Sequence, residues 1–207
     1  MPRKNRQPSQ SGYYHFINRG VNKKKIFHRP EDFTFYKLLL GEYKLEFDIK
    51  IIHYCLMSNH THLVVYSPDV TLLGRLAHFL QRRYAYYYCK TYKWQEQVFR
   101  NRYLSLPIEK DSYLMECGRY IERNPLEANL VSDLKDYEHS SYHYYALGRE
   151  DRLVTESPFY EDLGRTREER ALVYRYNVLN DRDSALEKNK TLKRILASET
   201  IFQPVPF

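Results

Sequence analysis

Cysteine is scarce in this sequence, and the residues that occur are far apart. Cys55, Cys89 and Cys117 form no CxxC pair, so the sequence indicates neither a zinc knuckle nor a disulfide framework. Free thiols among apolar and aromatic neighbours are typical of a reducing compartment. We therefore expect a cytoplasmic protein.

Long apolar runs are also missing. No stretch approaches the roughly 20 apolar residues that a membrane-spanning helix needs. The first ten residues are basic and contain no apolar segment, which excludes a secretory signal there. No glycine-rich phosphate-binding loop occurs either. The sequence thus predicts no membrane partner and no nucleotide cofactor.

The composition favours one main domain with a polyanionic partner. A chain of 207 residues with 43% hydrophobic content can form one well-buried domain of about 150 residues and an appendage. The formal net charge of +7 favours a partner rich in phosphate groups. The 21 tyrosines could stack on unpaired bases or pack at a half-wet surface.

The most informative stretch is a His-x-His pair between two apolar runs. Residues 49–56 and 63–66 are apolar, aromatic or β-branched and predict two strands, with Ser58-Asn59 as the turn. Because successive side chains of a strand point to opposite faces, His60 and His62 should share one face. Two such imidazoles can bind one divalent metal, although ordinary polar positions on a half-buried strand give the same pattern.

The remaining chain predicts alternating helices and strands. Pro125 disfavours helical geometry in the residue before it, so the third helix should end by Asn124. The expected elements outside the hairpin are strand 13–19, helix 31–46, helix 71–92, strand 98–106 and a helix from Asp111 or Ser112. The order β-α-β-β-α-β plus a helix predicts an α+β, ferredoxin-like antiparallel sheet.

Basic residues that could contact a nucleic acid backbone gather in three places. They are Arg19, Lys23 and Lys24 around the end of the first strand, Arg82 and Arg83 on the second helix, and Arg100 and Arg102 on one face of the last strand. A solvated turn explains the lysines equally well, and two solvated edge residues explain the strand arginines.

Four ordered motifs resemble the REP-associated tyrosine transposases, which belong to the HUH single-strand endonucleases. The motifs are Asn18-Arg19-Gly20, residues 54–63, residues 119–131 and Ser140-Ser141-Tyr142. The resemblance covers roughly residues 13–148. It implies the same ferredoxin-like fold and a DNA-cutting activity at single strands near hairpins.

The resemblance also implies roles for individual residues. Tyr120 matches the family's nucleophile, and His60, His62 and Asn124 match its metal-binding positions. Two imidazoles and an amide oxygen suit Mg²⁺ or Mn²⁺. In the family, the tyrosine captures the 5′ phosphate covalently and frees a 3′ hydroxyl.

We therefore expect a transposase-like, metal-dependent nuclease and strand transferase that acts at hairpin-forming repetitive palindromes. Its expected partner is single-stranded or hairpin DNA, and the protein would be a monomer or a homodimer. The alternative is a module of the same fold that binds hairpin DNA or structured RNA without cutting it.

Several other polar residues have two interpretations. Only one of Tyr86, Tyr87 and Tyr88 can face any one site, so this run predicts helix surface and core. His53 precedes the hairpin at a polar position of the motif. Glu116 and Glu122 could assist the tyrosine or the metal from outside the ligand set, but solvated acids fit the pattern better.

We divide the chain into a flexible basic tail (1–12), a catalytic domain (13–148) and a helical C-terminal extension (149–207) that departs from the compact core. An amphipathic helix should begin at Thr166, and a basic helix should begin at Lys188. The apolar residues expected on the first of these helices are Leu172, Val173, Tyr176 and Leu179. The extension could bind the DNA hairpin, cover the active site or pad the core.

Overall fold

The computed structural model describes residues 7–100, 102–109 and 111–180. The basic helix expected from Lys188 therefore lies outside the described residues. Within the expected N-terminal tail, the backbone N–H groups of Gln10 and Ser11 donate hydrogen bonds to the Glu109 carboxylate. None of the described helices is long and apolar enough to cross a membrane.

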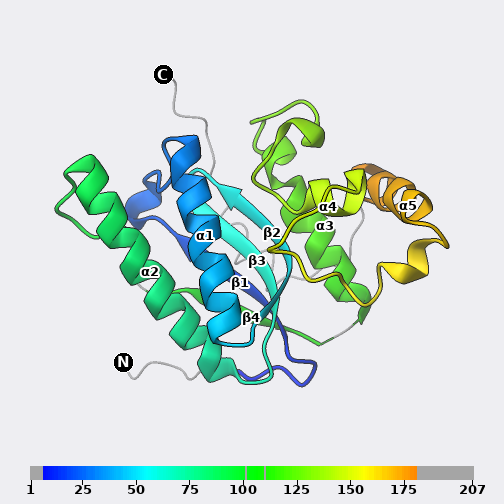
Figure 1. Cartoon of the computed structure of the whole chain (residues 1–207), viewed down its shortest axis with the longest axis horizontal. Coiled ribbons are helices and arrows are strands. Elements are labelled where there is room, and N and C mark those ends of the chain that lie inside the picture. Colours follow the sequence, from blue (N-terminus) through cyan, green and yellow to red (C-terminus); the bar gives the residue numbers. More distant parts are fainter. Residues whose placement is uncertain (1–6, 101, 110, 181–207) are drawn as a thin grey trace.

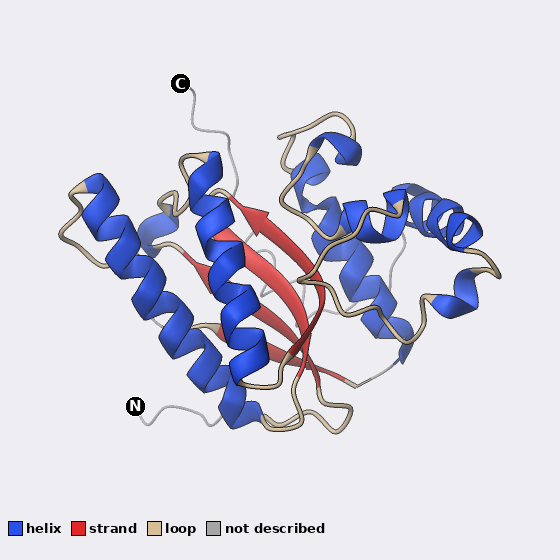
Figure 2. Cartoon of the chain, viewed as in Figure 1, coloured by secondary structure: helices blue, strands red, loops and turns tan. Residues whose placement is uncertain are grey.

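A four-stranded antiparallel sheet forms the centre of the molecule (Figures 1 and 2), in the order β2-β3-β1-β4. The strands are β1 (Tyr13–Arg19), β2 (Lys50–Met57), β3 (His60–Tyr66) and β4 (Leu104–Ile108). Met57 pairs with His60 across the predicted Ser58-Asn59 turn. Together with the helices, this arrangement confirms the α+β, ferredoxin-like fold.

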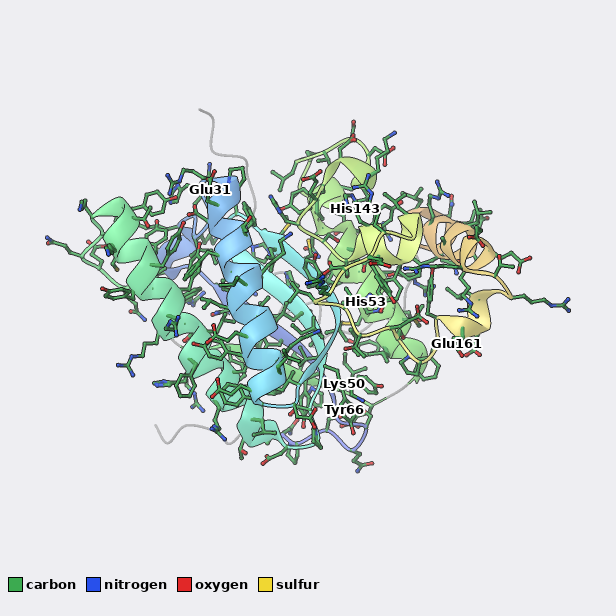
Figure 3. The ribbon with its side chains drawn as sticks, viewed as in Figure 1. Glu31, Lys50, His53, Tyr66, His143 and Glu161 are labelled. Atoms are coloured by element: carbon green, nitrogen blue, oxygen red, sulfur yellow. The ribbon has the colours of Figure 1, made fainter. Side chains whose placement is uncertain are left out.

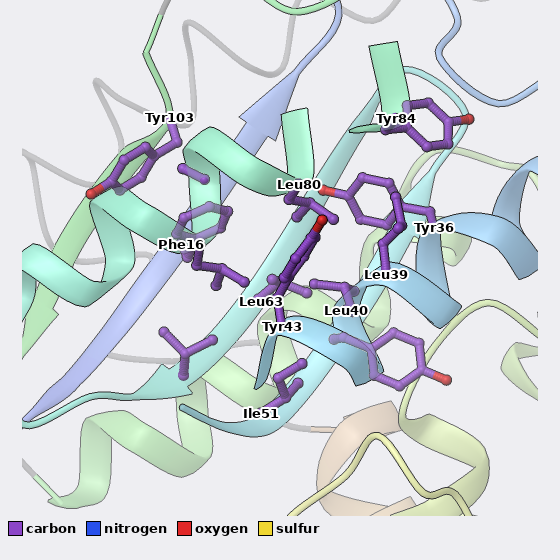
Figure 4. Close-up of a cluster of buried hydrophobic side chains, with 14 of the residues drawn as sticks. Phe16, Tyr36, Leu39, Leu40, Tyr43, Ile51, Leu63, Leu80, Tyr84 and Tyr103 are labelled. Atoms are coloured by element: carbon purple, nitrogen blue, oxygen red, sulfur yellow. The ribbon is translucent and has the colours of Figure 1, made fainter. Parts of the chain in front are cut away.

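Helices α1 (Pro30–Glu46) and α2 (Val70–Tyr92) cover one face of the sheet. Both helices begin and end close to the residues that the sequence predicted. Phe16 and Leu63 of the sheet pack there against Leu40 of α1 and Leu80 of α2 (Figure 4). The alternation of β1 and β3 sends their other side chains to the opposite face.

Helix α3 (Asp111–Glu127) packs on that opposite face. Val64 of β3 and Cys55 of β2 form an apolar cluster there with Cys117 and Ile121 of α3. In Figure 1 this helix stands with α4 (Tyr142–Leu147) and α5 (Arg167–Asn180), apart from α1 and α2. Three short 3₁₀ turns complete the described elements: η1 (Val21–Lys23), η2 (Leu134–Asp136) and η3 (Glu161–Leu163).

The prediction that the third helix ends by Asn124 is wrong, because α3 continues through Pro125 to Glu127. Proline has no N–H with which to bond the carbonyl of Ile121. The side-chain amide of Asn124 donates to that carbonyl at 3.1 Å instead. The side chain thus replaces the missing backbone donor, and the helix extends by almost a turn.

The predicted strand 98–106 is also wrong at its start, because β4 begins at Leu104. Ile17 pairs with Leu104, while Gly20 forms an isolated bridge with Phe99. Two residues lie between Ile17 and Gly20, but four lie between Phe99 and Leu104. Because these numbers differ, the two segments cannot pair regularly between the two bridges. Arg100 and Arg102 are exposed in this irregular segment and do not share a strand face.

Residues 149–180 pack on the core, which is one of the three roles that the sequence left open for the extension. Leu153 joins the α1–α2 core, and Thr155 donates a backbone hydrogen bond to Ile51 of β2. Helix α5 forms as predicted but packs through Ala171, Tyr174 and Val178. The apolar residues that the sequence analysis assigned to this helix, Leu172, Val173, Tyr176 and Leu179, are exposed. Both sets have helical spacing, so the periodicity alone could not choose between the two faces.

Candidate active site

His60 and His62 lie on the α3 face of the sheet, as the alternation of β3 predicts. Arg19 pairs with His60 and Ile17 pairs with His62 across β1. The two imidazole rings are 4.8 Å apart between centroids and nearly perpendicular. His62 is completely buried and His60 almost so.

A third histidine, His15, joins this pair and was not predicted from the sequence. Its Nε2 lies 2.9 Å from Nδ1 of His62, and its side chain is buried. The alternation of β1 places His15 on the same face as Arg19. The sequence was enough to predict that His15 and Arg19 share a face. It was not enough to predict the pairing register of β1 with β3, which brings His15 to His62.

Tyr120 of α3 completes the group of rings. Its ring centroid lies 6.4 Å from those of both His15 and His62, with nearly perpendicular planes. The Tyr120 side chain is half-buried. The structure thus brings the expected nucleophile into ring contact with His62, one of the expected metal ligands.

Asn124 follows Tyr120 by one helical turn. Its Nδ2 donates to the backbone carbonyls of Tyr120 and Ile121, both at 3.1 Å. Because these bonds use only the nitrogen, the amide is oriented and Oδ1 stays available as a ligand. The proline at position 125 therefore helps to fix the direction of the Asn124 side chain.

The local electrostatics keep the three histidines neutral. Burial first, and then the positive charge of Arg19, lower the pKa of His15 and of His60 to about 3. Burial also lowers the pKa of His62 well below its ordinary value, and His60, His15 and Arg19 add to this effect. A neutral imidazole keeps a lone pair on one nitrogen, which is the form that binds metals.

The chemistry of these donors fits a divalent metal. Nε2 of His62 is buried without a hydrogen-bond partner. Leaving a buried polar atom unpaired costs free energy, and a metal ion bound to Nε2 would remove that cost. In the described part of the chain, no group of three or more His, Cys, Asp or Glu side chains is arranged to hold a metal. The expected ligand set contains two such side chains, His60 and His62, and its third donor is the amide oxygen of Asn124.

The expected DNA-binding residues are spread over several surfaces. Arg19 is half-buried beside His60, and Arg100 donates its backbone N–H to the Arg19 carbonyl at 2.7 Å. Lys23 and Lys24 are exposed in and after η1. Arg82 and Arg83 are exposed on α2, which covers the opposite face of the sheet from Tyr120.

Lys24 and Arg83 are among the cations that contact other side chains of the chain. Nζ of Lys24 lies 4.0 Å from the centre of the Trp94 ring and 3.4 Å from the Glu96 carboxylate. Arg83 approaches the Glu42 carboxylate at 3.9 Å. Both contacts are at the surface, where a phosphate could replace the carboxylate at little cost.

The tyrosine run of α2 serves as surface and core, which confirms the prediction. Tyr86 is 72% exposed and Tyr88 is buried. The hydroxyl of Tyr87 donates to the Asp32 carboxylate at 2.8 Å. Among the aromatic contacts of the described residues, the rings that approach His62 are His15, His60 and Tyr120.

Glu122 is buried, so the interpretation as a solvated acid is wrong. Its carboxylate binds Nδ1 of His53 at 3.0 Å and accepts hydrogen bonds from the hydroxyls of Ser141 and Tyr174. Figure 3 shows His53 between the sheet and the α3–α5 side of the molecule. Glu122 lies on the buried side of α3 and faces His53, Ser141 and Tyr174. The sequence did not identify that side.

Glu116 is only partly solvated. It is half-buried, and its Oε2 is buried without a hydrogen-bond partner. Glu116 precedes Tyr120 by one helical turn on α3.

A solved structure of the same fold supports this description. A structure of the REP-associated tyrosine transposase bound to a REP hairpin superposes with a TM-score of 0.57 at 14% identity. The superposition covers 76% of this chain and 93% of the other. A putative transposase from Deinococcus radiodurans R1 matches at a TM-score of 0.41 and 18% identity, over 59% of this chain and 97% of the other. At this level, the first likeness shows the fold and the second carries no weight.

A search of curated proteins finds no match to the chain. The family model of IS200-like transposases, in contrast, matches residues 9–124. That segment is more than half of the chain and contains β1 to β4, both histidines of the pair, Tyr120 and Asn124. The chain therefore belongs to the family of IS200-like transposases.

Proposed function

We propose that this chain is a metal-dependent endonuclease and strand transferase of single-stranded DNA, with Tyr120 as its nucleophile. The observation that carries the proposal is the packing of the Tyr120 ring against His62 and His15 at 6.4 Å. A phenol that served only as packing would need no neighbouring pair of neutral, buried imidazoles. Membership in a transposase family supports the same activity.

In the proposed reaction, the Tyr120 oxygen attacks the scissile phosphorus. A bond forms between this oxygen and phosphorus, and the bond from phosphorus to the 3′ oxygen breaks. Overall, the phenol loses a proton and the leaving 3′ oxygen gains one. The 5′ phosphate remains on Tyr120 as a phosphotyrosine. Attack of a 3′ hydroxyl on this ester reverses the step and joins strands without a nucleoside triphosphate.

His60, His62 and Asn124 would hold the metal, which we propose to be Mg²⁺ or Mn²⁺. When bound, such an ion supplies Lewis-acid polarisation of the scissile phosphate. The chain contributes the neutral imidazoles, the oriented amide of Asn124 and the burial that excludes water from His62. Tyr120 is half-buried, and we propose that its hydroxyl reaches the substrate.

We propose hairpin-forming palindromes with single-stranded flanks as the substrate. The REP-associated transposase structure contains a REP hairpin, and this chain has the same fold. The net charge of +7 favours phosphate contacts. We place the contacts to DNA at Arg19, Lys23, Lys24, Arg82, Arg83, Arg100 and Arg102.

The test uses labelled palindromic strands from the same genome, with and without Mn²⁺. We expect cleavage with Mn²⁺, a covalent protein–DNA adduct and no cleavage in excess chelator. Fully paired DNA should be cut less than the hairpin with single-stranded flanks. Tight hairpin binding without an adduct under any condition would contradict the proposal and favour a non-cleaving binding module.

A further inference from the structure

His15 contacts the candidate site but has no role in the proposed reaction. It lies on β1, diagonally across from His62, since it pairs with Val64 while His62 pairs with Ile17. Diagonal neighbours on one sheet face are within reach of long side chains. The two rings are 5.1 Å apart and inclined by 33°, and the bond from Nε2 of His15 to Nδ1 of His62 is 2.9 Å long.

One proton is shared in this bond, so only two arrangements are possible for the neutral rings. If His62 donates from Nδ1, its Nε2 carries the lone pair and can bind a metal. If His15 donates from Nε2, His62 must carry its own proton on Nε2 and cannot bind a metal there. The direction of one hydrogen bond thus decides whether His62 is a ligand.

We propose that His15 is a positioning residue that accepts the hydrogen bond from Nδ1–H of His62 and so directs the lone pair of Nε2 toward the metal. The inference rests on the proposed function in taking His62 as a ligand. It is independent of the proposed function in that the arrangement of protons exists before any metal binds. A metal-ligating histidine commonly donates its second N–H to a fixed acceptor, which sets its tautomer and ring orientation.

The burial of the pair supports a fixed acceptor. His15 and His62 are 1% and 0% exposed, so water does not compete for the bond between them. Nδ1 of His15 and Nε2 of His62 both lack a hydrogen-bond partner. The second of these is the atom that the proposal assigns to the metal. His15 also contacts Tyr120 at 6.4 Å, so the same ring fixes a ligand and borders the nucleophile.

Three variants separate acceptance of the bond from simple packing. His15→Gln keeps an oxygen near the place of Nε2 and can accept the bond. His15→Leu retains bulk but has no acceptor. His139→Leu is the matched control, because it removes another imidazole, half-buried and stacked on Phe33 of α1, without touching His62.

The first measurement is made on metal-free protein with ¹⁵N-labelled histidine. Long-range ¹H–¹⁵N correlations of the imidazole rings distinguish the two tautomers, and the signals are assigned with the His15 and His62 variants. We expect the wild type to show His62 protonated on Nδ1. A His62 ring protonated on Nε2 would overturn the proposal, whatever the protein does with metal.

The second measurement is the affinity for Mn²⁺, read from the signal of free Mn²⁺ in electron paramagnetic resonance. We expect His15→Leu to weaken binding by about 10- to 100-fold, while His15→Gln and His139→Leu stay within a few fold of the wild type. Affinity in His15→Leu equal to that of the wild type would overturn the proposal. Equal losses in His15→Leu and His15→Gln would also overturn it, because acceptance of the bond would then not matter.

The two proposals fail in different ways. If the wild type does not bind Mn²⁺, the metal assignment of the proposed function is wrong, and the tautomer of His62 still decides the role of His15. If His15→Leu does not fold, the wild-type tautomer and the His15→Gln affinity decide it.

Discussion

The hydroxyl of Tyr174 in α5 donates a hydrogen bond to the carboxylate of Glu122 in α3 at 2.9 Å. Both side chains are completely buried, and Glu122 lies two residues beyond Tyr120. The carboxylate also binds His53 of β2. The helix that carries the proposed nucleophile is therefore joined to the sheet through His53 and to α5 through Tyr174.

Tyr174→Phe should lower the free energy of unfolding by about 1.5 to 3 kcal/mol, because it removes a hydrogen bond to a buried carboxylate. Urea unfolding monitored by circular dichroism measures this difference. Tyr176→Phe is the control, since that tyrosine lies on the same helix but is 67% exposed, and it should change stability by less than about 0.5 kcal/mol. Similar effects of the two variants would show that the contact with Glu122 contributes little.

His62→Ala should abolish cleavage and Mn²⁺ binding while the affinity for hairpin DNA stays within a few fold. The reason is that the imidazole is assigned to the metal and the DNA contacts are assigned to other residues. The exposed His78 of α2 provides the control, and His78→Ala should behave as the wild type in all three assays. Cleavage by His62→Ala at the wild-type rate would contradict the metal assignment.

Asn124 has two separable tasks, as a donor to the Ile121 carbonyl and as the proposed metal ligand. Asn124→Ala should lower both stability and Mn²⁺ affinity, the latter less than His62→Ala because water can replace an amide oxygen. Adding Pro125→Ala restores a backbone N–H for the Ile121 carbonyl. The double variant should regain stability but not Mn²⁺ affinity. Recovery of both would mean that Asn124 acts only through the helix.

Binding of hairpin DNA should weaken steeply with salt, because each phosphate contact releases counterions. Replacing Arg100 and Arg102 by Gln should reduce the slope of log affinity against log salt by about 1 to 2 units. We expect a smaller change from Arg82→Gln with Arg83→Gln, because α2 covers the sheet face opposite Tyr120. Fluorescence anisotropy at several salt concentrations measures both slopes. A larger effect of the α2 pair would place the DNA on the other face.

Local patterns in the sequence were enough to predict most of the fold. The hairpin around Ser58-Asn59, helices α1 and α2 and the shared face of His60 and His62 follow from periods of 2 and 3.6 residues. These features depend on neighbours in the sequence. The chemical roles of Tyr120 and Asn124 came from a resemblance and not from such patterns.

The errors arose where distant parts of the chain decide the structure. His15 becomes part of the site only through the register of β1 on β3. Glu122 can be buried because His53 of β2, Ser141 before α4 and Tyr174 of α5 bring polar partners to it from three other segments. Helix α3 passes Pro125 because a side chain supplies the donor that proline lacks. The buried face of α5 could not be chosen from the sequence, because two of its faces are apolar.

The most direct test of the proposed chemistry compares Tyr120→Phe with the wild type on one hairpin substrate in Mn²⁺. This change keeps the ring and its contacts with His15 and His62 and removes only the hydroxyl. The wild type should form a DNA adduct that survives denaturing electrophoresis and maps by mass spectrometry to the peptide containing Tyr120. The variant should bind the hairpin with similar affinity and form no adduct. An undiminished adduct in Tyr120→Phe, or an adduct that maps to Tyr86, Tyr87 or Tyr88, would contradict the assignment of the nucleophile.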